Sequence, residues 1–485
     1  MNWRPHAASL LAGAAAVLGF SPFDVFPALL AALAVLVHLW MRAPAPRAAF
    51  AAGFLFGLGF FLAGVSWVYV SLHRFGGMPA PLAALATFGF CAFLALFPAL
   101  AGWAQARLAP AALRPLAIPA AWVLAEWLRG TILTGFPWLA VGAAAVDTPL
   151  AGYAPLGGMY LVSLLVMAAA VMLWMIAARR GRWAAAAGFA ALGIAGAALQ
   201  RVEWTQPSGP PVSVSLLQGN VPQGLKFDPA RYERTLATYL RLAEGSRARL
   251  IVLPETAVPR FLDAVDPAFL GQLRGVAVRN DGDLLLGVPT RSAASGYRNS
   301  VVSLGVSPSA VYDKVHLVPL GEFVPPGFGW ILAVLQIPLS DFARGSEAQR
   351  PLTVAGERVA INICYEDAYG AEILRQLPEA TLLVNVSNVA WFGDSLAPGQ
   401  HLQIARQRAV ETGRMHLTAA NTGITAAIGA DGRVLAHLPQ FVEGRLDLEA
   451  QGRRGATPYA VVADWPALAL CALLLVFIAA RSRSR

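Results

Sequence analysis

The stretch Arg358–Gly370 reads RVAINICYEDAYG, and the rest of the chain is organised around it. Large apolar residues alternate with smaller or polar ones from Val359 to Ile363, which is the period of a half-buried β-strand. Cys364 ends this run, and Tyr365 and Glu366 follow directly. A loop after a strand can present such a thiol to a substrate. The stretch therefore predicts a strand with a candidate nucleophile at its end.

An isolated cysteine also fits a different interpretation, a buried core thiol. Cys364 is the only cysteine between residues 204 and 455, while Cys91 and Cys471 lie in long apolar runs typical of membrane helices. A single thiol cannot form a disulfide within its own domain. In an exported domain an unpaired cysteine needs a reason, and catalysis supplies one.

Two other stretches favour catalysis. RLIVLPETAVP, residues 249–259, is a predicted strand that ends at Glu255, and VYDKVHLVPLGEFVP, residues 311–325, carries Lys314 and Glu322. Glu, Lys and Cys in this order resemble the triad of the nitrilase, or carbon-nitrogen hydrolase, superfamily. LPETAVP, DKVHLVPLGEFVP, ICYED and NVSNVAWFGDS together resemble the apolipoprotein N-acyltransferase family, and the apolar remainder of the chain is similar to that family as well.

The composition is that of a membrane protein. Of 485 residues, 57% are hydrophobic and 13% are charged, about half the charged fraction of a soluble domain. The length leaves room for one sizeable soluble domain. Residues 203–455 hold 23 Lys and Arg against 24 Asp and Glu, and the rest holds 14 against 4. The net charge of +9 thus belongs to the membrane part, which argues against nucleic-acid binding.

Eight apolar runs predict eight membrane spans, and most reach the roughly 20 residues that a bilayer requires. They lie near residues 8–20, 25–40, 48–70, 80–105, 115–134, 157–178, 183–200 and 460–480. The first also fits a cleaved signal peptide, but no cleavage site follows Phe20, so a retained helix is expected. Arginines gather on one side of the alternating loops, which predicts cytoplasmic termini. We expect membrane helices one to seven in residues 1–202, a periplasmic domain in 203–455, and helix eight with a basic tail in 456–485. The expected location is a bacterial inner membrane.

The soluble part alternates predicted strands and helices. Strands are expected at VSVSLLQ, LIVLPE, DLLLGVP, NSVVSLG, RVAINIC, TLLVNVS and HLTAANT, and helices at residues 230–246 and 398–412. This order predicts a layered α/β domain. The nitrilase resemblance implies the finer expectation of an α-β-β-α sandwich.

The chemistry expected of the triad is nucleophilic acyl transfer. A thiol attacks an ester as thiolate, so it needs a base, and Glu255 fills that role if a dry site raises its pKa. Lys314, one of only two lysines in a chain with 37 basic residues, would stabilise the oxyanion together with the backbone N–H of Tyr365. The resemblance places Glu322 beside the lysine, and it places Tyr365 and Glu366 in the active site. Glu366 would hold the loop by accepting N–H bonds, whereas Glu322 also fits a solvated loop charge.

The candidates for substrate binding are defined less tightly by the sequence than the triad is. Arg129, three residues after Glu126 in the fifth run, fits either a local ion pair or a contact to a phospholipid head group. Phe227 stands where the family often has tryptophan, and Trp391 matches the family motif. Val389 stands where the motif has an acidic residue, so that residue's contact must be met otherwise. No metal-binding or nucleotide-binding pattern is present, and we expect no metal and no cofactor.

The resemblance implies acyl transfer from a membrane phospholipid to the N-terminal amine of a diacylglyceryl-modified apolipoprotein, through a thioester on Cys364, by a monomer. One alternative is a membrane-tethered nitrilase-type amidase that passes the acyl group to water; eight spans argue against it. Another is a transporter with an external domain, which would place ionisable residues in several helices. The fifth run carries the pair Glu126 and Arg129, and the other runs carry only His38 and Asp464, each near the end of its run.

The apolar segment 323–339, FVPPGFGWILAVLQIPL, predicts a lid over the acyl chain, with Phe328, Trp330 and Leu332 at the membrane interface. It also fits a core segment of the soluble domain. Changing Trp330 and Leu332 to Asp should reduce thioester formation from phospholipid vesicles far more than it reduces thermal stability. A short, water-soluble thioester should still acylate Cys364 in this variant. Equal loss of both reactions, or unfolding, would identify the segment as core.

Overall fold

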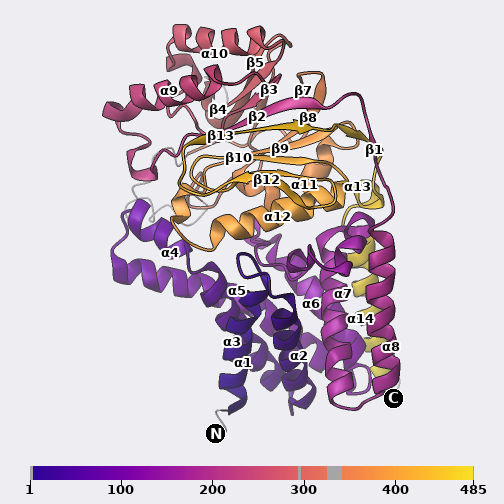
Figure 1. The fold of residues 1–485 in the computed structure, drawn as a ribbon. Helices are drawn as coiled ribbons and strands as arrows, with labels where there is room; N and C mark the ends of the chain where they lie inside the picture. Colours follow the sequence, from indigo (N-terminus) through magenta and orange to yellow (C-terminus); the bar gives the residue numbers. More distant parts are fainter. Residues whose placement is uncertain (1–3, 293–295, 325–340, 484–485) are drawn as a thin grey trace. The chain divides into compact units, whose positions relative to one another are not determined.

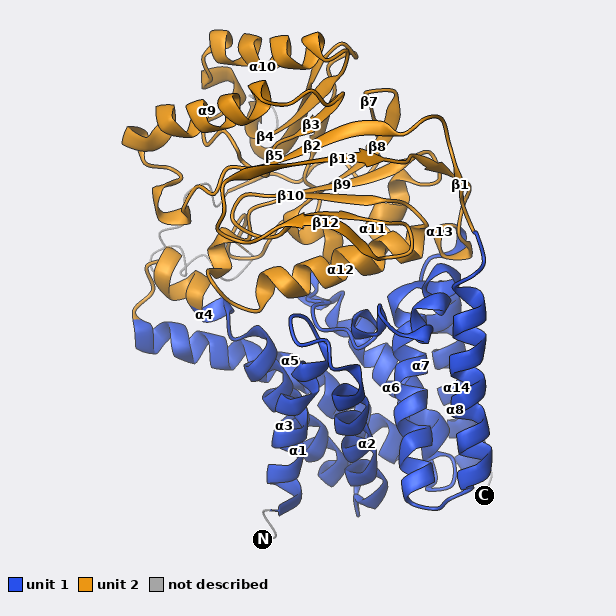
Figure 2. Cartoon of the chain, in the orientation of Figure 1, with its two compact units in different colours: residues 1–69, 80–203, 461–485 blue, residues 70–79, 204–460 orange. Residues whose placement is uncertain are grey.

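The structure is a computed structural model that describes residues 4–292, 296–324 and 341–483 (Figure 1). The chain divides into two compact units (Figure 2). Unit 1 comprises residues 1–69, 80–203 and 461–485, and unit 2 comprises residues 70–79 and 204–460. Residues 70–79 therefore belong to unit 2, although they lie in sequence between two helices of unit 1. The domain limits expected after residues 202 and 455 stay predictions.

Unit 1 is helical, and each of the eight apolar runs contains a helix. The helices are α1 (Arg4–Ala16), α2 (Phe26–Arg42), α3 (Pro46–Val65), α5 (Ala80–Leu108), α6 (Arg114–Arg129), α7 (Ala154–Ala177), α8 (Arg182–Leu199) and α14 (Trp465–Arg483). Among the described residues, five helical segments are long and apolar enough to cross a membrane: Pro46–Val65, Ala80–Leu108, Pro149–Ala177, Arg182–Leu199 and Trp465–Ser482. Helices α1, α2 and α6 are shorter, so the full set of eight spans stays a prediction.

Glycine allows the helices of unit 1 to approach closely. A Cβ on Gly59 of α3 would lie 2.1 Å from the carbonyl oxygen of Leu10 in α1, and one on Gly53 would lie 2.3 Å from that of Pro98 in α5. Neither neighbour is a side chain that can move aside. Small residues at helix contacts are the usual means of packing helices within a bilayer.

Unit 2 contains two six-stranded sheets. The first has the order β13-β2-β3-β4-β5-β6 and the second β12-β11-β10-β9-β8-β7. The strands of the first are β2 (Val212–Gln218), β3 (Leu250–Val252), β4 (Asp283–Ser292), β5 (Gly296–Gly305), β6 (Val311–Asp313) and β13 (Gly444–Ala450). Those of the second are β7 (Leu352–Val354), β8 (Glu357–Ile363), β9 (Leu382–Ser387), β10 (His416–Ala420), β11 (Thr425–Ile428) and β12 (Val434–Leu438). β1 (Gln206–Pro207) and β14 (Arg453–Arg454) form a separate pair.

The sheets pack face to face, with helices on their outer faces (Figure 1). The core between them joins residues of both sheets, among them Val214, Val252, Ile361 and Val384. Helices α9 (Pro229–Glu244) and α10 (Pro267–Arg279) cover the first sheet, and α11 (Gly370–Ile373) and α12 (Ala397–Thr412) cover the second. This is the α-β-β-α sandwich that the sequence analysis expects.

Strand β8, which carries the nucleophile candidate at its end, is buried on both faces. Val359, Ile361 and Ile363 enter the core between the sheets, whereas Ala360 packs beneath α11. β8 runs parallel to β9, with Val359 opposite Leu382. The alternation in the sequence therefore separates two buried interfaces rather than a buried face from a solvated one.

Replacing Ile361 with Ala should lower the free energy of unfolding of unit 2 by about 2–5 kcal/mol, since the side chain is fully buried and the strands around it cannot close the cavity. Val306→Ala is the control, because Val306 is 51% exposed and should change stability by less than about 0.5 kcal/mol. Urea unfolding of the purified protein in detergent measures both. Equal effects of the two substitutions would contradict the assigned core.

Candidate active site

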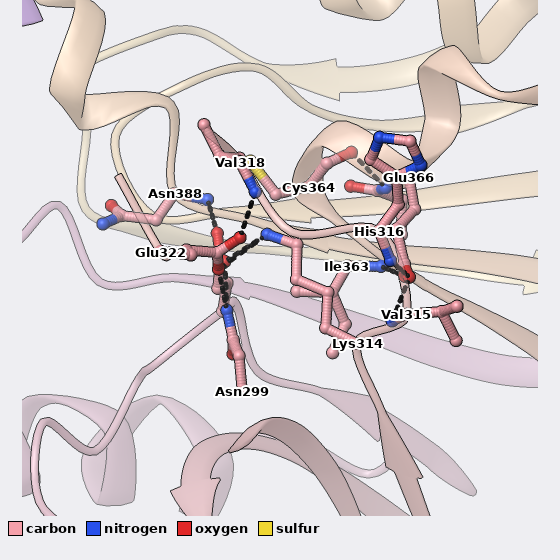
Figure 3. A network of polar contacts seen from close by, with 12 residues as sticks. Asn299, Lys314, Val315, His316, Val318, Glu322, Ile363, Cys364, Glu366 and Asn388 are labelled. Atoms are coloured by element: carbon pink, nitrogen blue, oxygen red, sulfur yellow. Dashed lines mark hydrogen bonds and ion pairs between the residues drawn. The ribbon is translucent and has the colours of Figure 1, made fainter. Parts of the chain in front are cut away.

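The triad residues meet where strands of both sheets end. Glu255 follows β3, Lys314 follows β6, and Cys364 follows β8 and begins the short 3₁₀ helix η9 (Cys364–Ala368). Asn388, after β9, joins them by donating its backbone N–H to Glu255 Oε2 at 2.8 Å. The sequence order Glu, Lys, Cys thus becomes one polar cluster, shown in Figure 3.

Lys314 is the centre of this cluster. Its Nζ lies 3.3 Å from Glu255 Oε1 and 2.9 Å from Glu322 Oε1, and the residue is 1% exposed. The side-chain amide of Asn299 on β5 donates to both of these carboxylate oxygens, at 2.7 and 2.8 Å. Glu322 Oε2 accepts the backbone N–H of Val318 at 2.8 Å. Glu322 is therefore part of the buried network and not a solvated loop charge.

The backbone of Cys364 has a conformation that L-residues seldom adopt. Its φ is +54°, and its carbonyl oxygen lies 3.1 Å from both Asn385 Nδ2 and His401 Nε2. A non-glycine residue in this left-handed region costs on the order of 1–3 kcal/mol and persists where its surroundings impose it. The amide of Asn385 and the ring of His401 on α12 provide such surroundings, and the Cys364 thiol itself is half-buried.

Electrostatics keep the resting site as a thiol beside a carboxylate. Burial, reinforced by the charge of Glu255, raises the pKa of Cys364 well above its usual range, against the opposing effect of Lys314. Burial alone would raise the pKa of Glu255, but Lys314 and Lys226 outweigh it and hold that pKa below its usual value. The condition set for Glu255, a raised pKa, is therefore not met, because the charges of Lys314 and Lys226 stabilise the carboxylate. Burial would likewise lower the pKa of Lys314, yet Glu255 and Glu322 raise it.

Glu366 links the turn that begins at Cys364, the nucleophile turn, to the loop that begins at Lys314, the lysine loop. Its Oε1 accepts the backbone N–H groups of Val315 at 2.7 Å and His316 at 3.0 Å. Its Oε2 accepts the backbone N–H of Ile363 at 2.7 Å and the O–H of Tyr312 at 3.1 Å. Figure 3 shows Glu366 next to Val315, His316 and Ile363. Burial raises the pKa of Glu366 to about 7, although its donors oppose the shift. These bonds are of the kind expected from the sequence.

Tyr365 lies next to the nucleophile with its ring in an aromatic cluster. The Tyr369 hydroxyl donates to the Tyr365 hydroxyl at 2.9 Å, and the ring of His316 stacks on Tyr369 with centroids 3.6 Å apart. The Tyr365 side chain is thus part of an aromatic cluster with Tyr369 and His316. Its backbone N–H stays the predicted second oxyanion donor.

Two aromatic substrate candidates lie in unit 2, Phe227 in the turn after Gln223–Leu225 and Trp391 in the short 3₁₀ helix η11 (Val389–Phe392). Phe227 and Trp391 are half-buried, and the Trp391 ring meets Phe75 edge to face with centroids 6.0 Å apart. Val389, at the departure from the family motif, is buried and packs beside Gly423, where a Cβ would lie 2.2 Å from it. The predicted lid residues Phe328, Trp330 and Leu332 fall in 325–340, outside the described residues.

Arg129 lies in unit 1 and is buried. Its Nη1 donates to the carbonyl oxygens of Phe136 at 2.5 Å and Trp138 at 2.6 Å, and its Nη2 lies 3.9 Å from Glu126 Oε1. The local ion pair is therefore present, and the guanidinium also holds the loop that follows α6. Arg129 and Glu126 line a small pocket with aromatic neighbours such as Phe61 and Trp122. Contact with a head group stays a prediction.

Several residues of the polar cluster around Lys314 were not predicted from the sequence. Asn299, Asn388 and His401 left no local signal, because each is one polar residue in a strand, loop or helix. Lys226 did leave a signal, since it is the other lysine of an arginine-rich chain. It is 3% exposed, and its Nζ donates to the backbone oxygen of Glu255 at 3.0 Å. Within the described part of the chain, no group of three or more His, Cys, Asp or Glu side chains could hold a metal ion.

Comparison with known proteins gives consistent matches. Residues 12–172 match the family model described as apolipoprotein N-acyltransferase N-terminal domain, and residues 213–459 match that of carbon-nitrogen hydrolase. The apolipoprotein N-acyltransferase of Nitrosomonas europaea is 49% identical over 97% of this chain and 96% of its own, and that of Ralstonia nicotianae is 44% identical over 98% and 92%. Among solved structures, a carbon-nitrogen hydrolase from Helicobacter pylori aligns with 53% of this chain and 94% of its own, at 19% identity and a TM-score of 0.38.

Replacing Glu366 with Gln should reduce turnover more than tenfold, because the amide NH₂ would face the N–H of Ile363 in place of an acceptor. A buried donor left without an acceptor costs about 1–3 kcal/mol, so thermal stability should fall as well. Glu347→Gln is the control, since the Glu347 side chain is 70% exposed and pairs with Arg375 on the surface. Acyl transfer rates and melting temperatures measure the two effects. Near-normal turnover of Glu366→Gln would show that the four hydrogen bonds do not hold the nucleophile turn.

Proposed function

This chain belongs to the apolipoprotein N-acyltransferase family, and we propose on that premise that it transfers an acyl chain from a membrane phospholipid to the N-terminal amine of a diacylglyceryl-modified apolipoprotein. The observation that carries the proposal is the buried cluster of Glu255, Lys314 and Glu322 next to the Cys364 thiol. A carboxylate base, a fixed cation and a thiol are the parts that acyl transfer through a thioester requires.

In the first half-reaction, Cys364 Sγ attacks the ester carbonyl of the phospholipid and its proton passes to Glu255. The resting thiol is protonated and Glu255 is ionised, so this transfer accompanies bond formation and does not precede it. Lys314 and the N–H of Tyr365 stabilise the oxyanion. The carbon–oxygen bond then breaks, the leaving alcohol of the lysophospholipid takes the proton from Glu255, and the acyl group remains on sulfur as a thioester.

In the second half-reaction, the unprotonated α-amine of the apolipoprotein attacks the thioester. Glu255 accepts a proton from the attacking nitrogen, and Lys314 again faces the oxyanion. The carbon–sulfur bond breaks, the thiolate leaves, and the proton held by Glu255 restores the thiol. The net change converts an ester and an amine into an alcohol and an amide, and it needs no cofactor.

The proposed setting is the inner membrane of a bacterium, with eight spans, cytoplasmic termini and a periplasmic unit 2 in a monomer. The helix in each apolar run, and the arginines that collect on one side of the alternating connections, support this topology. An outward unit 2 places the thiol on the side of the membrane where exported lipoproteins arrive.

Exposure of the purified protein to phospholipid without acceptor should add the mass of one acyl chain, and hydroxylamine should remove it. The adduct should map to Cys364, and Cys364→Ser should gain no mass while keeping the wild-type melting temperature. Intact-mass and peptide spectrometry make both measurements.

Addition of a diacylglyceryl-modified peptide should then discharge the adduct onto the peptide amine. An adduct that disappears in plain water as fast as it forms would favour a membrane-tethered amidase that passes the acyl group to water. An adduct on any residue other than Cys364 would refute the assigned nucleophile.

A further inference from the structure

A second lysine reaches the catalytic glutamate from a different part of unit 2. Lys226 follows the 3₁₀ helix η6 (Gln223–Leu225), in the connection between β2 and α9. Its side chain is buried, and its Nζ donates to the backbone oxygen of Glu255 at 3.0 Å. The described residues provide this ammonium with one hydrogen bond for three donors and no carboxylate in direct contact. Burying a cation in this way is costly, so a compensating role is expected.

The loop that carries Lys226 is tied to the site by side-chain amides. Gln223 accepts the Nδ2 of Asn388 at 2.8 Å, and Asn388 in turn donates its backbone N–H to Glu255. Asn421 binds both Asn388 and the backbone of Val221. The lysine is therefore held in place by the same residues that hold the base.

The charges around Lys226 do not balance without it. Glu255 after β3 and Glu322 in the loop after β6 are two carboxylates, and Lys314 is one ammonium between them. His401 of α12 contacts the carbonyl oxygen of Cys364, and Asp367 of η9 pairs with His416 at 3.1 Å. Without Lys226 the group of Glu255, Glu322 and Lys314 carries a net negative charge, and a thiolate on Cys364 would add to it. With Lys226 protonated, two ammonium groups balance the charges of the two carboxylates.

We propose that Lys226 is a positioning residue for the acyl transfer: its ammonium keeps Glu255 ionised and offsets the negative charge that reaches the Cys364 sulfur. The proposal rests on the thiol chemistry proposed above, but it does not depend on the identity of donor or acceptor. Lys226 acts through the pair of Glu255 and Cys364, whereas Lys314 faces the oxyanion.

The ionisation of Lys226 makes its effect on the thiol depend on pH, which a purely structural hydrogen bond would not do. Burial lowers the pKa of Lys226 to about 8, and the charges of Glu255 and Cys364 limit the shift. The amine is therefore mostly charged at pH 7 and mostly neutral above pH 9. Its effect on the thiol should be present at the lower pH and fade at the higher one.

The test is the rate at which iodoacetamide alkylates Cys364 in the full-length protein in detergent, between pH 6.5 and 10, followed by peptide mass spectrometry. Lys226→Gln keeps a donor for the Glu255 carbonyl and removes the charge, and Lys226→Met removes both. At pH 7 both should react about tenfold more slowly than wild type, as expected for roughly one pKa unit. The difference should shrink toward none above pH 9. Arg234→Gln, which removes an exposed charge from α9, should match wild type throughout.

Three results would overturn the proposal. Wild-type rates in Lys226→Gln with slow alkylation in Lys226→Met would assign Lys226 to the carbonyl hydrogen bond alone. A rate ratio that stays constant with pH would indicate a change of structure and not of charge. Wild-type rates in both variants would show that the ammonium does not act on the thiol. If Lys226→Met does not fold, Lys226→Gln alone decides, because its pH dependence separates the same outcomes. The reagent contains no lipid, so these results stand apart from whether the protein acylates lipoproteins.

Discussion

The proposed active site depends on one buried ammonium group held between two carboxylates. Lys314 is almost inaccessible to solvent, and Glu255 and Glu322 both lie within ion-pair distance of its Nζ. Removing one partner from such a cluster leaves an uncompensated buried charge, which typically costs about 3–5 kcal/mol. The arrangement also fixes geometry, because Glu322 is bound to the loop at Val318 and Asn299 bridges both carboxylates from β5. The position of each charge is therefore set by the other charges as well as by the backbone.

The same cluster joins the two sheets of the sandwich. Glu255, Asn299 and Lys314 come from the first sheet or the loops that follow its strands, whereas Cys364 and Asn388 follow strands of the second. The bond from Asn388 to Glu255 and the bonds from Glu366 to the lysine loop cross between the sheets. Neither sheet alone contains the proposed nucleophile together with its proposed base. Packing of the apolar core between them is thus a condition for chemistry and not only for stability.

The sequence predicted the strands and site residues that a local pattern of residues determines. β2 lies at Val212–Gln218 as expected, and Glu322 and Glu366 lie in the predicted site. β12 and β13 were not predicted, because solvent-facing residues such as His437 and Arg445 break their apolar runs. The lowered pKa of Glu255 and the approach of Lys226 could not be inferred, since both depend on which distant segments meet in the fold. The predicted lid lies outside the described residues, so its structure adds nothing to that expectation.

The contact between Phe75 and Trp391 has a consequence for the modularity of the enzyme. Residues 70–79 are inserted in sequence between α3 and α5, yet they are a structural part of unit 2. A soluble fragment cut at residues 204 and 460 would lose the aromatic partner of Trp391 and the neighbour of Gly393 at Val70. A fragment cut at these two points therefore lacks part of unit 2, so the hydrolase-like unit is not one continuous segment of the chain.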